Sequence, residues 1–413
     1  MIHFDRFVLS NGLRVLVHED TATPMAVVNV LYDVGSRDED PGKTGFAHLF
    51  EHLMFGGSKN IKDYDEPLQM AGGENNAYTT DDLTNYYIQL PSENLETAFW
   101  LESDRMLSLA FSKKSLDVQR KVVSEEFKEH YLNKPYGDAW MKMREMAYKE
   151  HPYRWLTIGK ELSHIEDATL KDVKDFFFAH YRPVNAILVV AGNVRTEKVR
   201  ELAEKWFGPI EAGTPYVRNL PREPVQRSAR KETAQGRVPL DAIYKTWHMD
   251  TRTSPRYYAV DLLTEILGGG ASSRLFQALV KEQKLFSNIE CYQFGTIDPG
   301  LVAIEGKLVK GVDFKTAEAA IDEVLEKLKV DGVGDRERQK VKHKTESQIA
   351  FEDMSVMSRA GSLAYYELLG DADLMNRELN NYQAVRSVDL LEEARLVFTE
   401  ENSNTLYYQS QQE

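Results

Sequence analysis

The sequence contains a single cysteine, Cys291, among 413 residues. No intrachain disulfide can form, and a lone cysteine is more often a small core residue than a nucleophile. Lack of disulfides fits the cytoplasm, although exported proteins can also lack them. Residues 1–5 show no basic start leading into an apolar stretch, the pattern of a signal peptide. We therefore expect the cytoplasm for this sequence, or the periplasm if a signal peptide has been removed.

Long apolar runs and an excess of positive charge are also lacking. No run approaches the roughly 18–20 residues of a membrane span. The chain has 51 Lys and Arg against 65 Asp and Glu, a net charge of −14, so it repels phosphate backbones. Without a basic patch interleaved with aromatics, we expect no nucleic-acid partner. Hydrophobic residues, at 42%, suffice for sizeable cores, and the length suggests two or three domains.

Short strands and amphipathic helices follow one another along the chain. Asn11-Gly12 is a hairpin signal between two apolar segments. The patterns predict strands over 7–9, 13–17, 25–34, 75–90 (as a pair), 185–193, 242–247 and 301–308. They predict helices over 45–55, 92–109, 114–131, 196–206, 257–267 and 314–328. The expected class is α/β in the broad sense, more strictly α+β.

The second half repeats the order of the first. A helix followed by Gly-Gly occurs at 53–57 and again at 266–269, and a strand followed by a helix occurs at 186–206 and 301–328. We interpret the halves as diverged copies of one unit. The helix before the second Gly-Gly contains no histidine, so only the first copy can keep chemistry based on histidine.

A change of composition separates the two copies. Pro215, Pro221 and Pro224 lie among Arg, Glu, Gln and Ser, which is typical of an extended connection. The sequence therefore predicts an N-terminal domain at 1–212, a linker at 213–240 and a homologous C-terminal domain at 241–413.

The motif that carries chemistry is His48-Leu49-Phe50-Glu51-His52. On a helix, residues four apart lie on one face, so His48 and His52 can offer two imidazole nitrogens to one metal. Nitrogen ligands beside a carboxylate suit zinc best. Zinc would lower the pKa of a bound water, and Glu51 would take the water's proton and pass it to a leaving amine. We expect one Zn2+ per chain.

The alternative is that these polar residues are a solvated helix surface. The flanking residues argue against it, because they are nearly all apolar: Phe46, Ala47, Leu49, Phe50, Leu53, Met54 and Phe55. A mostly buried helix with three polar side chains needs partners for them. A third metal ligand must come from elsewhere.

The acidic segment 114–131 offers Glu125, Glu126 and Glu129 as that ligand. If the segment is helical, one face carries Gln119, Val122, Val123, Glu126 and His130. The residues alone leave the choice among the three glutamates open.

The order His-x-x-Glu-His is the inverzincin signature, and segment 45–55 resembles the insulinase/pitrilysin family of zinc metallopeptidases. Within that family, it resembles the shorter bacterial members and the catalytic subunit of the mitochondrial processing peptidase. The resemblance covers nearly the whole chain and includes 73–79, 122–126, 151–153, 181–186 and 272–275. It implies two domains, each a mainly antiparallel sheet with helices packed on it. It also implies endopeptidase activity on unfolded peptides in a chamber of four such domains.

The resemblance assigns further residues. Glu126 ends the Val-Val-x-x-Glu stretch, 74 residues after His52, and so corresponds to the third zinc ligand. Asn76 and Ala77 correspond to an edge strand that binds the substrate backbone, although Gly72-Gly73 could simply be a turn into a strand. Gln119 stands where the family has a second glutamate, so we expect Gln119 and His130 to support the site only from outside the ligand set.

One departure from the family concerns the second half. Family members often have an Arg and a Tyr, seven residues apart, that bind the substrate carbonyl near the zinc. The matching positions here are Val280 and Ser287, which cannot take that role. We therefore predict a heterodimer with a homologous subunit that supplies the Arg/Tyr pair, with a homodimer as the alternative.

The sequence is compatible with three functions: an active endopeptidase subunit, a non-catalytic structural or assembly relative, and a peptide-binding protein whose metal only stabilises its fold. Non-catalytic relatives typically lose the metal motif, and this chain keeps all four residues. The first interpretation is therefore favoured, with a peptide as the substrate. Zinc content combined with a cleavage assay distinguishes the three.

Overall fold

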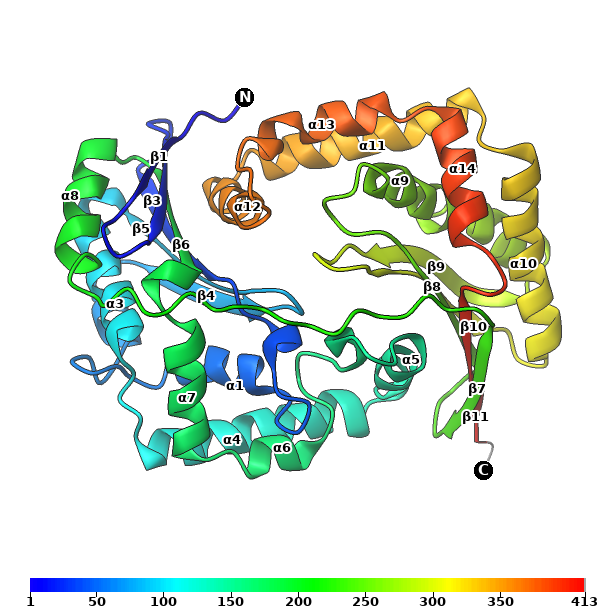
Figure 1. Ribbon diagram of the computed structural model, residues 1–413. Coiled ribbons are helices and arrows are strands. Elements are labelled where there is room, and N and C mark those ends of the chain that lie inside the picture. Colours follow the sequence, from blue (N-terminus) through cyan, green and yellow to red (C-terminus); the bar gives the residue numbers. More distant parts are fainter. Residues whose placement is uncertain (412–413) are drawn as a thin grey trace. The chain divides into compact units, whose positions relative to one another are not determined.

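The computed structural model describes residues 1–411 as helices and strands that form two separate sheets (Figure 1). The chain divides into two compact units. Unit 1 comprises Met1–Lys128, Trp155–Pro221 and Ala350–Asn376, and unit 2 comprises Glu129–Arg154, Arg222–Ile349 and the chain from Arg377 onward. The α+β class is confirmed. The predicted limits 1–212, 213–240 and 241–413 describe consecutive sequence copies and stay a prediction.

Unit 1 contains a six-stranded sheet in the order β1-β2-β6-β3-β5-β4. Its strands are β1 (Asp5–Val8), β2 (Arg14–Glu19), β3 (Met25–Tyr32), β4 (Glu74–Thr79), β5 (Thr84–Pro91) and β6 (Ala186–Gly192). All neighbours are antiparallel except β2 and β6. β6 is buried along its whole length because both of its faces are covered. β4 is an edge strand.

Unit 1 has helices on both faces of its sheet and further helices that pack on other helices. They are α1 (Phe46–Leu53), α2 (Asp65–Met70), α3 (Leu95–Leu107), α4 (Lys113–Phe127), α6 (Leu162–Glu166), α7 (Leu170–His180), α8 (Thr196–Trp206) and α12 (Val356–Leu368). In Figure 1, α3 and α8 lie on one face and α12 on the other. The predicted helix over 196–206 is confirmed residue for residue.

Unit 2 contains a five-stranded sheet in the order β7-β11-β8-β10-β9. Its strands are β7 (Arg230–Gly236), β8 (Ala242–His248), β9 (Phe286–Phe294), β10 (Leu301–Leu308) and β11 (Ser403–Ser410). β7 and β11 are parallel and the other pairs antiparallel. This is the topology of β2-β6-β3-β5-β4 in unit 1, so the two sheets repeat one order of strands. The expected match of 301–328 with 186–206 is wrong, because β10 holds the place of β5 and β11 that of β6.

The two halves of the chain exchange a helix. α5 (Ala139–Ala147) comes from the first half of the sequence, but Met143 and Met146 pack with Tyr244 and Leu406 in unit 2. In turn, α12 comes from the second half and packs on β3 and β6 of unit 1. The other helices are α9 (Tyr257–Gly268), α10 (Phe314–Asp331), α11 (Asp335–Glu352), α13 (Leu374–Ala384) and α14 (Ser387–Val397). Each sheet thus depends on both halves of the sequence.

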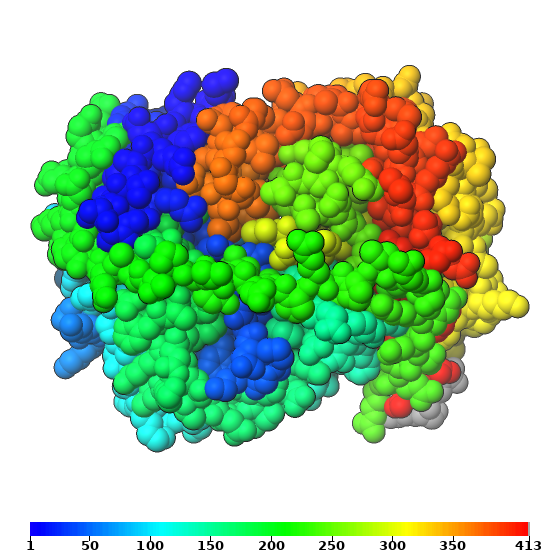
Figure 2. Space-filling model, in the orientation of Figure 1, coloured from blue at the N-terminus to red at the C-terminus, as the bar shows by residue number. Residues whose placement is uncertain are grey.

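The stretch interpreted as a linker has no helix or strand until Arg230, where β7 begins. Residues 211–221 run extended over the surface of unit 1, green in Figure 2. Arg218 fastens this segment, because its guanidinium donates to Asp38 at 2.7 Å and to Asp33 at 2.9 Å.

Within residues 1–411, no helix combines the length and the apolar character that crossing a bilayer would require.

We expect Leu363→Ala to lower the free energy of unfolding by about 2–5 kcal/mol, because Leu363 is fully buried between α12 and the sheet of unit 1 and its loss leaves a cavity. Denaturant titration followed by circular dichroism measures the loss. Leu396→Ala is the control, since Leu396 is 56% exposed and should shift stability by no more than about 0.5 kcal/mol. Equal small effects in both variants would show that α12 is not packed as described.

Candidate metal centre

The short helix α1 carries the motif. Its five buried residues are apolar and point into unit 1: Phe46, Ala47, Leu49, Phe50 and Leu53. The remaining residues, His48, Glu51 and His52, are half-buried and form one polar stripe. The helix starts after Gly45, whose φ is +86°, and the chain leaves it through Gly56-Gly57. The helix expected over 45–55 is therefore present, but it is shorter and covers Phe46–Leu53.

Three side chains converge beside this stripe. α1 packs against α4, which begins at the capping residue Ser112 and carries Glu126. One ligand atom each from His48, His52 and Glu126 lies within 4.8 Å of the other two. The Glu126 Oε2 atom is 3.8 Å from His48 Nε2 and 3.5 Å from His52 Nε2. Two nitrogens and one carboxylate oxygen are a donor set for a catalytic zinc with an open position.

The electrostatics of the cluster suit a metal. Burial lowers the pKa of His48 to about 4 and outweighs Glu126, which raises it. His48 is therefore neutral above about pH 5, and the neutral imidazole is the form that binds a metal ion. The His48 and His52 rings are 4.9 Å apart at 85°, so their nitrogens approach from two directions. Glu126, at 34% side-chain exposure, leaves one side of the cluster accessible.

Glu51 lies next to this cluster without belonging to it. Its Oε2 atom accepts a hydrogen bond of 2.6 Å from the Thr79 hydroxyl, which belongs to β4. Burial raises the pKa of Glu51, although the Thr79 hydrogen bond and His52 oppose the shift. A half-buried carboxylate with a raised pKa and a fixed orientation is suited to accept and return a proton. Sequence reasoning missed Thr79, because two threonines in a strand pattern signal only β propensity.

Asn76 and Ala77 lie on the edge strand β4, paired with β5 on one side only. The side chains along β4 alternate between exposed and half-buried. The Ala77 amide donates to the Asn76 side-chain oxygen at 2.8 Å. A strand edge next to a metal cluster could pair with an extended peptide backbone, so these residues stay a prediction consistent with their position.

Gln119 and His130 were expected to support the site from outside the ligand set. Gln119 is half-buried on α4, two turns before Glu126, and His130 is exposed in the π-helical segment Lys128–Leu132. A supporting role for either residue stays a prediction.

The positions that match the family's Arg and Tyr lie in unit 2. Val280 packs against the hydrophobic core of that unit. The Ser287 hydroxyl is exposed at the start of β9 and donates to the Lys307 carbonyl at 3.1 Å. The valine side chain has no hydrogen-bond donor, and the serine hydroxyl already donates within its own sheet.

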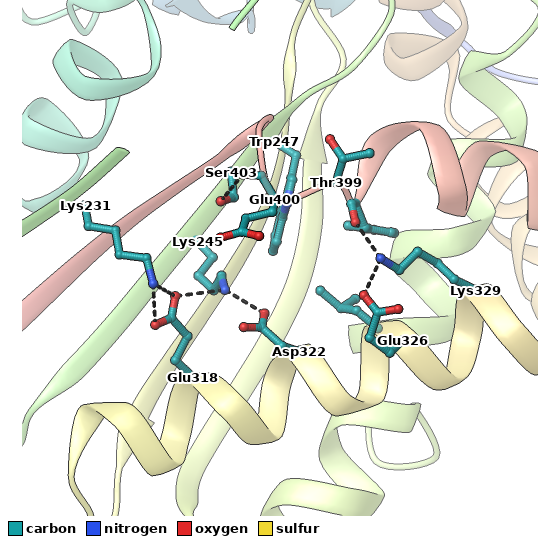
Figure 3. A pocket seen from close by; sticks show the side chains of 12 residues that line it. Lys231, Lys245, Trp247, Glu318, Asp322, Glu326, Lys329, Thr399, Glu400 and Ser403 are labelled. Atoms are coloured by element: carbon teal, nitrogen blue, oxygen red, sulfur yellow. Dashed lines mark hydrogen bonds and ion pairs between the residues drawn. The ribbon is translucent and has the colours of Figure 1, made fainter. Parts of the chain in front are cut away.

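A second charged site lies in unit 2, in a cavity of about 180 Å³ between the sheet and α10 (Figure 3). Glu318 accepts hydrogen bonds there from Lys231, Lys245, Thr405 and Tyr407. Burial disfavours the charged carboxylate, but Lys245 and Lys231 outweigh it and lower the pKa of Glu318 to about 2. This carboxylate is saturated with partners, so the network is a structural ion cluster that needs no ligand.

Comparison with known proteins agrees with the geometry. Residues 14–158 match the family described as Insulinase (Peptidase family M16), and residues 167–345 match the one described as Peptidase M16 inactive domain. The zinc protease PqqE of Helicobacter pylori is 31% identical over 413 residues, covering 97% of this chain and 91% of that protein. The uncharacterized zinc protease YmxG of Bacillus subtilis is 26% identical and covers 96% of each chain.

A solved structure extends this likeness to the fold. The crystal structure of a protease from Helicobacter pylori matches with a TM-score of 0.93 and 29% identity, covering 99% of this chain and 100% of that one. With the His48-x-x-Glu51-His52 motif in the region that matches the insulinase description, and with relatives named as zinc proteases, the chain belongs to the insulinase family of peptidases, family M16.

Proposed function

We propose that this chain is a zinc-dependent endopeptidase subunit that hydrolyses unfolded peptides or extended protein segments. The observation that carries the proposal is the approach of His48, His52 and Glu126 to one point, with the Glu51 carboxylate beside them. Four side chains from α1 and α4 meet where one edge of a sheet is open. Partly burying four polar side chains at one point costs free energy unless they bind a partner, so a purely structural helix surface would not favour this arrangement.

His48, His52 and Glu126 would hold the zinc. When bound, the zinc supplies a water of lowered pKa and a Lewis acid for the scissile carbonyl. Glu51 would be the base that takes up the proton of the attacking water and returns it to the leaving amine. The hydrogen bond from Thr79 keeps the carboxylate turned in one direction during both transfers.

The edge of β4 would position the substrate. An extended peptide that pairs with Asn76 and Ala77 is held through its backbone, so binding is tolerant of sequence. Most of the backbone of a folded protein is already paired within its own helices and sheets, which is the reason for proposing unfolded or extended substrates.

For the metal, we expect native protein to contain about one zinc per chain by elemental analysis and His52→Ala to lose it, because two remaining ligands hold the ion weakly. His343→Ala is the matched control, since His343 is exposed on α11. Zinc retained at wild-type level in His52→Ala would contradict the ligand assignment.

For the base, we expect Glu51→Gln to keep its zinc and to lose cleavage of an unstructured peptide by about 10²–10⁴-fold, because only the proton transfer is removed. Glu125→Gln, on the exposed side of α4, is the control and should cleave normally. Normal cleavage by Glu51→Gln would remove Glu51 from the mechanism. Zinc binding without any cleavage by the wild-type chain, with or without a partner, would instead favour a metal-stabilised peptide-binding protein.

We also propose that the active form is a heterodimer. Charge develops on the carbonyl oxygen during hydrolysis, and a donor aimed at it is worth about 10²–10³ in rate. Neither Val280, packed on the core, nor Ser287, bound to the Lys307 carbonyl, supplies such a donor. A homologous subunit with Arg and Tyr at these positions would complete the site.

The partner is tested by assaying the purified chain on an unstructured peptide, alone and with that subunit. We expect about a hundredfold higher activity for the pair, and no gain from a subunit whose Arg is replaced by Ala. High activity of this chain alone, as a monomer or homodimer, would contradict the heterodimer.

A further inference from the structure

Helix α1 is only eight residues long and carries two of the three proposed metal ligands. Its first backbone N–H groups have no acceptor within the helix, as at every helix start. His48 is the third residue of the helix, inside this first turn. Any fraying at this end therefore moves a metal ligand directly.

The chain cannot cap α1 in the usual way. Ser, Thr, Asp or Asn normally stands before a helix and accepts from its first turn. Here that position is Gly45, with φ at +86°, a conformation that side chains rarely adopt. A Cβ atom at residue 45 would lie 2.6 Å from the Ile158 carbonyl oxygen. Close packing thus excludes a side chain where the cap should be.

Glu39 supplies the cap from outside the helix. Its Oε2 atom accepts from the Gly45 amide at 2.9 Å and its Oε1 atom from the Ala47 amide at 2.8 Å. The Trp155 indole N–H donates to the same carboxylate at 3.1 Å. Glu39 is only 6% exposed. Burial raises the pKa of Glu39 well above its ordinary value, while the three N–H donors and the positive end of the helix act in the opposite direction.

We propose that Glu39 is a positioning residue for the metal centre: it fixes the start of α1 and so sets His48 and His52 in register with Glu126. The inference rests on the proposed function, because it concerns the residues proposed to hold zinc. Glu39 acts through the helix backbone, because it accepts from the amide of Ala47, the residue that precedes His48. Trp155 holds the carboxylate and donates also to the Ser36 carbonyl at 2.9 Å, which ties the cap to the turn before it.

The test is Glu39→Gln. Glutamine fills the same space but turns an NH2 group toward a backbone N–H, so half of the cap is lost. We expect zinc affinity, measured by chelator competition, to fall by about 10–100-fold. We also expect the visible absorption bands of the cobalt-substituted protein to shift, because they report ligand geometry. Circular dichroism should show that the fold is kept.

The matched control is Asp313→Ala, which removes the cap of α10 in unit 2, where Asp313 accepts from the Thr316 amide at 2.9 Å. It should lower the melting temperature but leave zinc affinity and the cobalt spectrum unchanged. Wild-type zinc affinity and an unshifted cobalt spectrum in Glu39→Gln would overturn the proposal. So would an equal loss of affinity in Asp313→Ala, because the effect would then follow general stability.

Trp155→Phe decides the question if Glu39→Gln does not fold. It removes the indole N–H but keeps an aromatic ring, so we expect zinc affinity to fall by about fivefold and the cobalt spectrum to shift. No change in either measurement would overturn the proposal.

Zinc affinity and the cobalt spectrum are measured without cleavage, so they test the role of Glu39 even if the zinc-loaded chain is inactive. A wild-type chain that binds no zinc would contradict both this inference and the proposed function.

Discussion

The packing of α1 against α4 is the contact on which the candidate site depends. An eight-residue helix is not stable on its own in water, so its conformation is imposed by what it packs against. The ligand atoms come from two helices, and a metal tolerates errors of only a few tenths of an ångström in their positions. Leu49, Phe50 and Leu53 bury one side of α1, and the polar stripe is left facing Glu126. Burial of apolar residues thus fixes the placement of polar ones.

Unit 2 has the same topology without this stripe, and within residues 1–411 the metal-binding cluster found lies in unit 1. α9 occupies in unit 2 the place in the strand order that α1 occupies in unit 1, between the counterparts of β3 and β4. It is longer, lacks histidine and is buried on nearly every side. It lies so close to β9 that a Cβ atom at Gly268 would be 1.9 Å from the Cys291 nitrogen. α9 therefore serves to pack the core of unit 2 and offers no metal ligand. This explains why the metal cluster lies in the first of the two copies.

Much of the fold could be predicted from local patterns. The apolar strand at 186–192, the strand at 301–308 and the amphipathic helix at 196–206 are signalled by periodicity alone. The i, i+4 histidines predicted a shared face, and their rings do lie together. Glu126 needed the family resemblance, because Glu125 and Glu129 fit the helical pattern about as well. Their exposure in the structure now separates them from Glu126.

What could not be predicted depends on contacts between distant segments. α5 and α12 are not among the helices expected from the sequence, and local periodicity does not tell which sheet a helix covers, so the exchange of helices was missed. Glu39 lies in a run of charged residues that looks like solvated surface, and only its three donors show otherwise.

The turn around Glu39 also explains why the polar residues before α1 are so dense. Asp38 holds Arg218 from the extended segment, and Arg37 is 2% exposed and bonds Asp82 beyond β4 at 2.9 Å. Glu39 directly follows Asp38 in the chain. Three segments distant in sequence therefore meet at one short turn, and Glu39 at the end of this turn accepts hydrogen bonds from the start of α1. Replacing a whole buried ion pair with apolar residues often costs little stability, so these pairs are better explained by the defined conformation that they give the turn. Rigidity is what a two-helix metal site requires, since a helix that shifts by one bond length no longer presents its nitrogens to the same point.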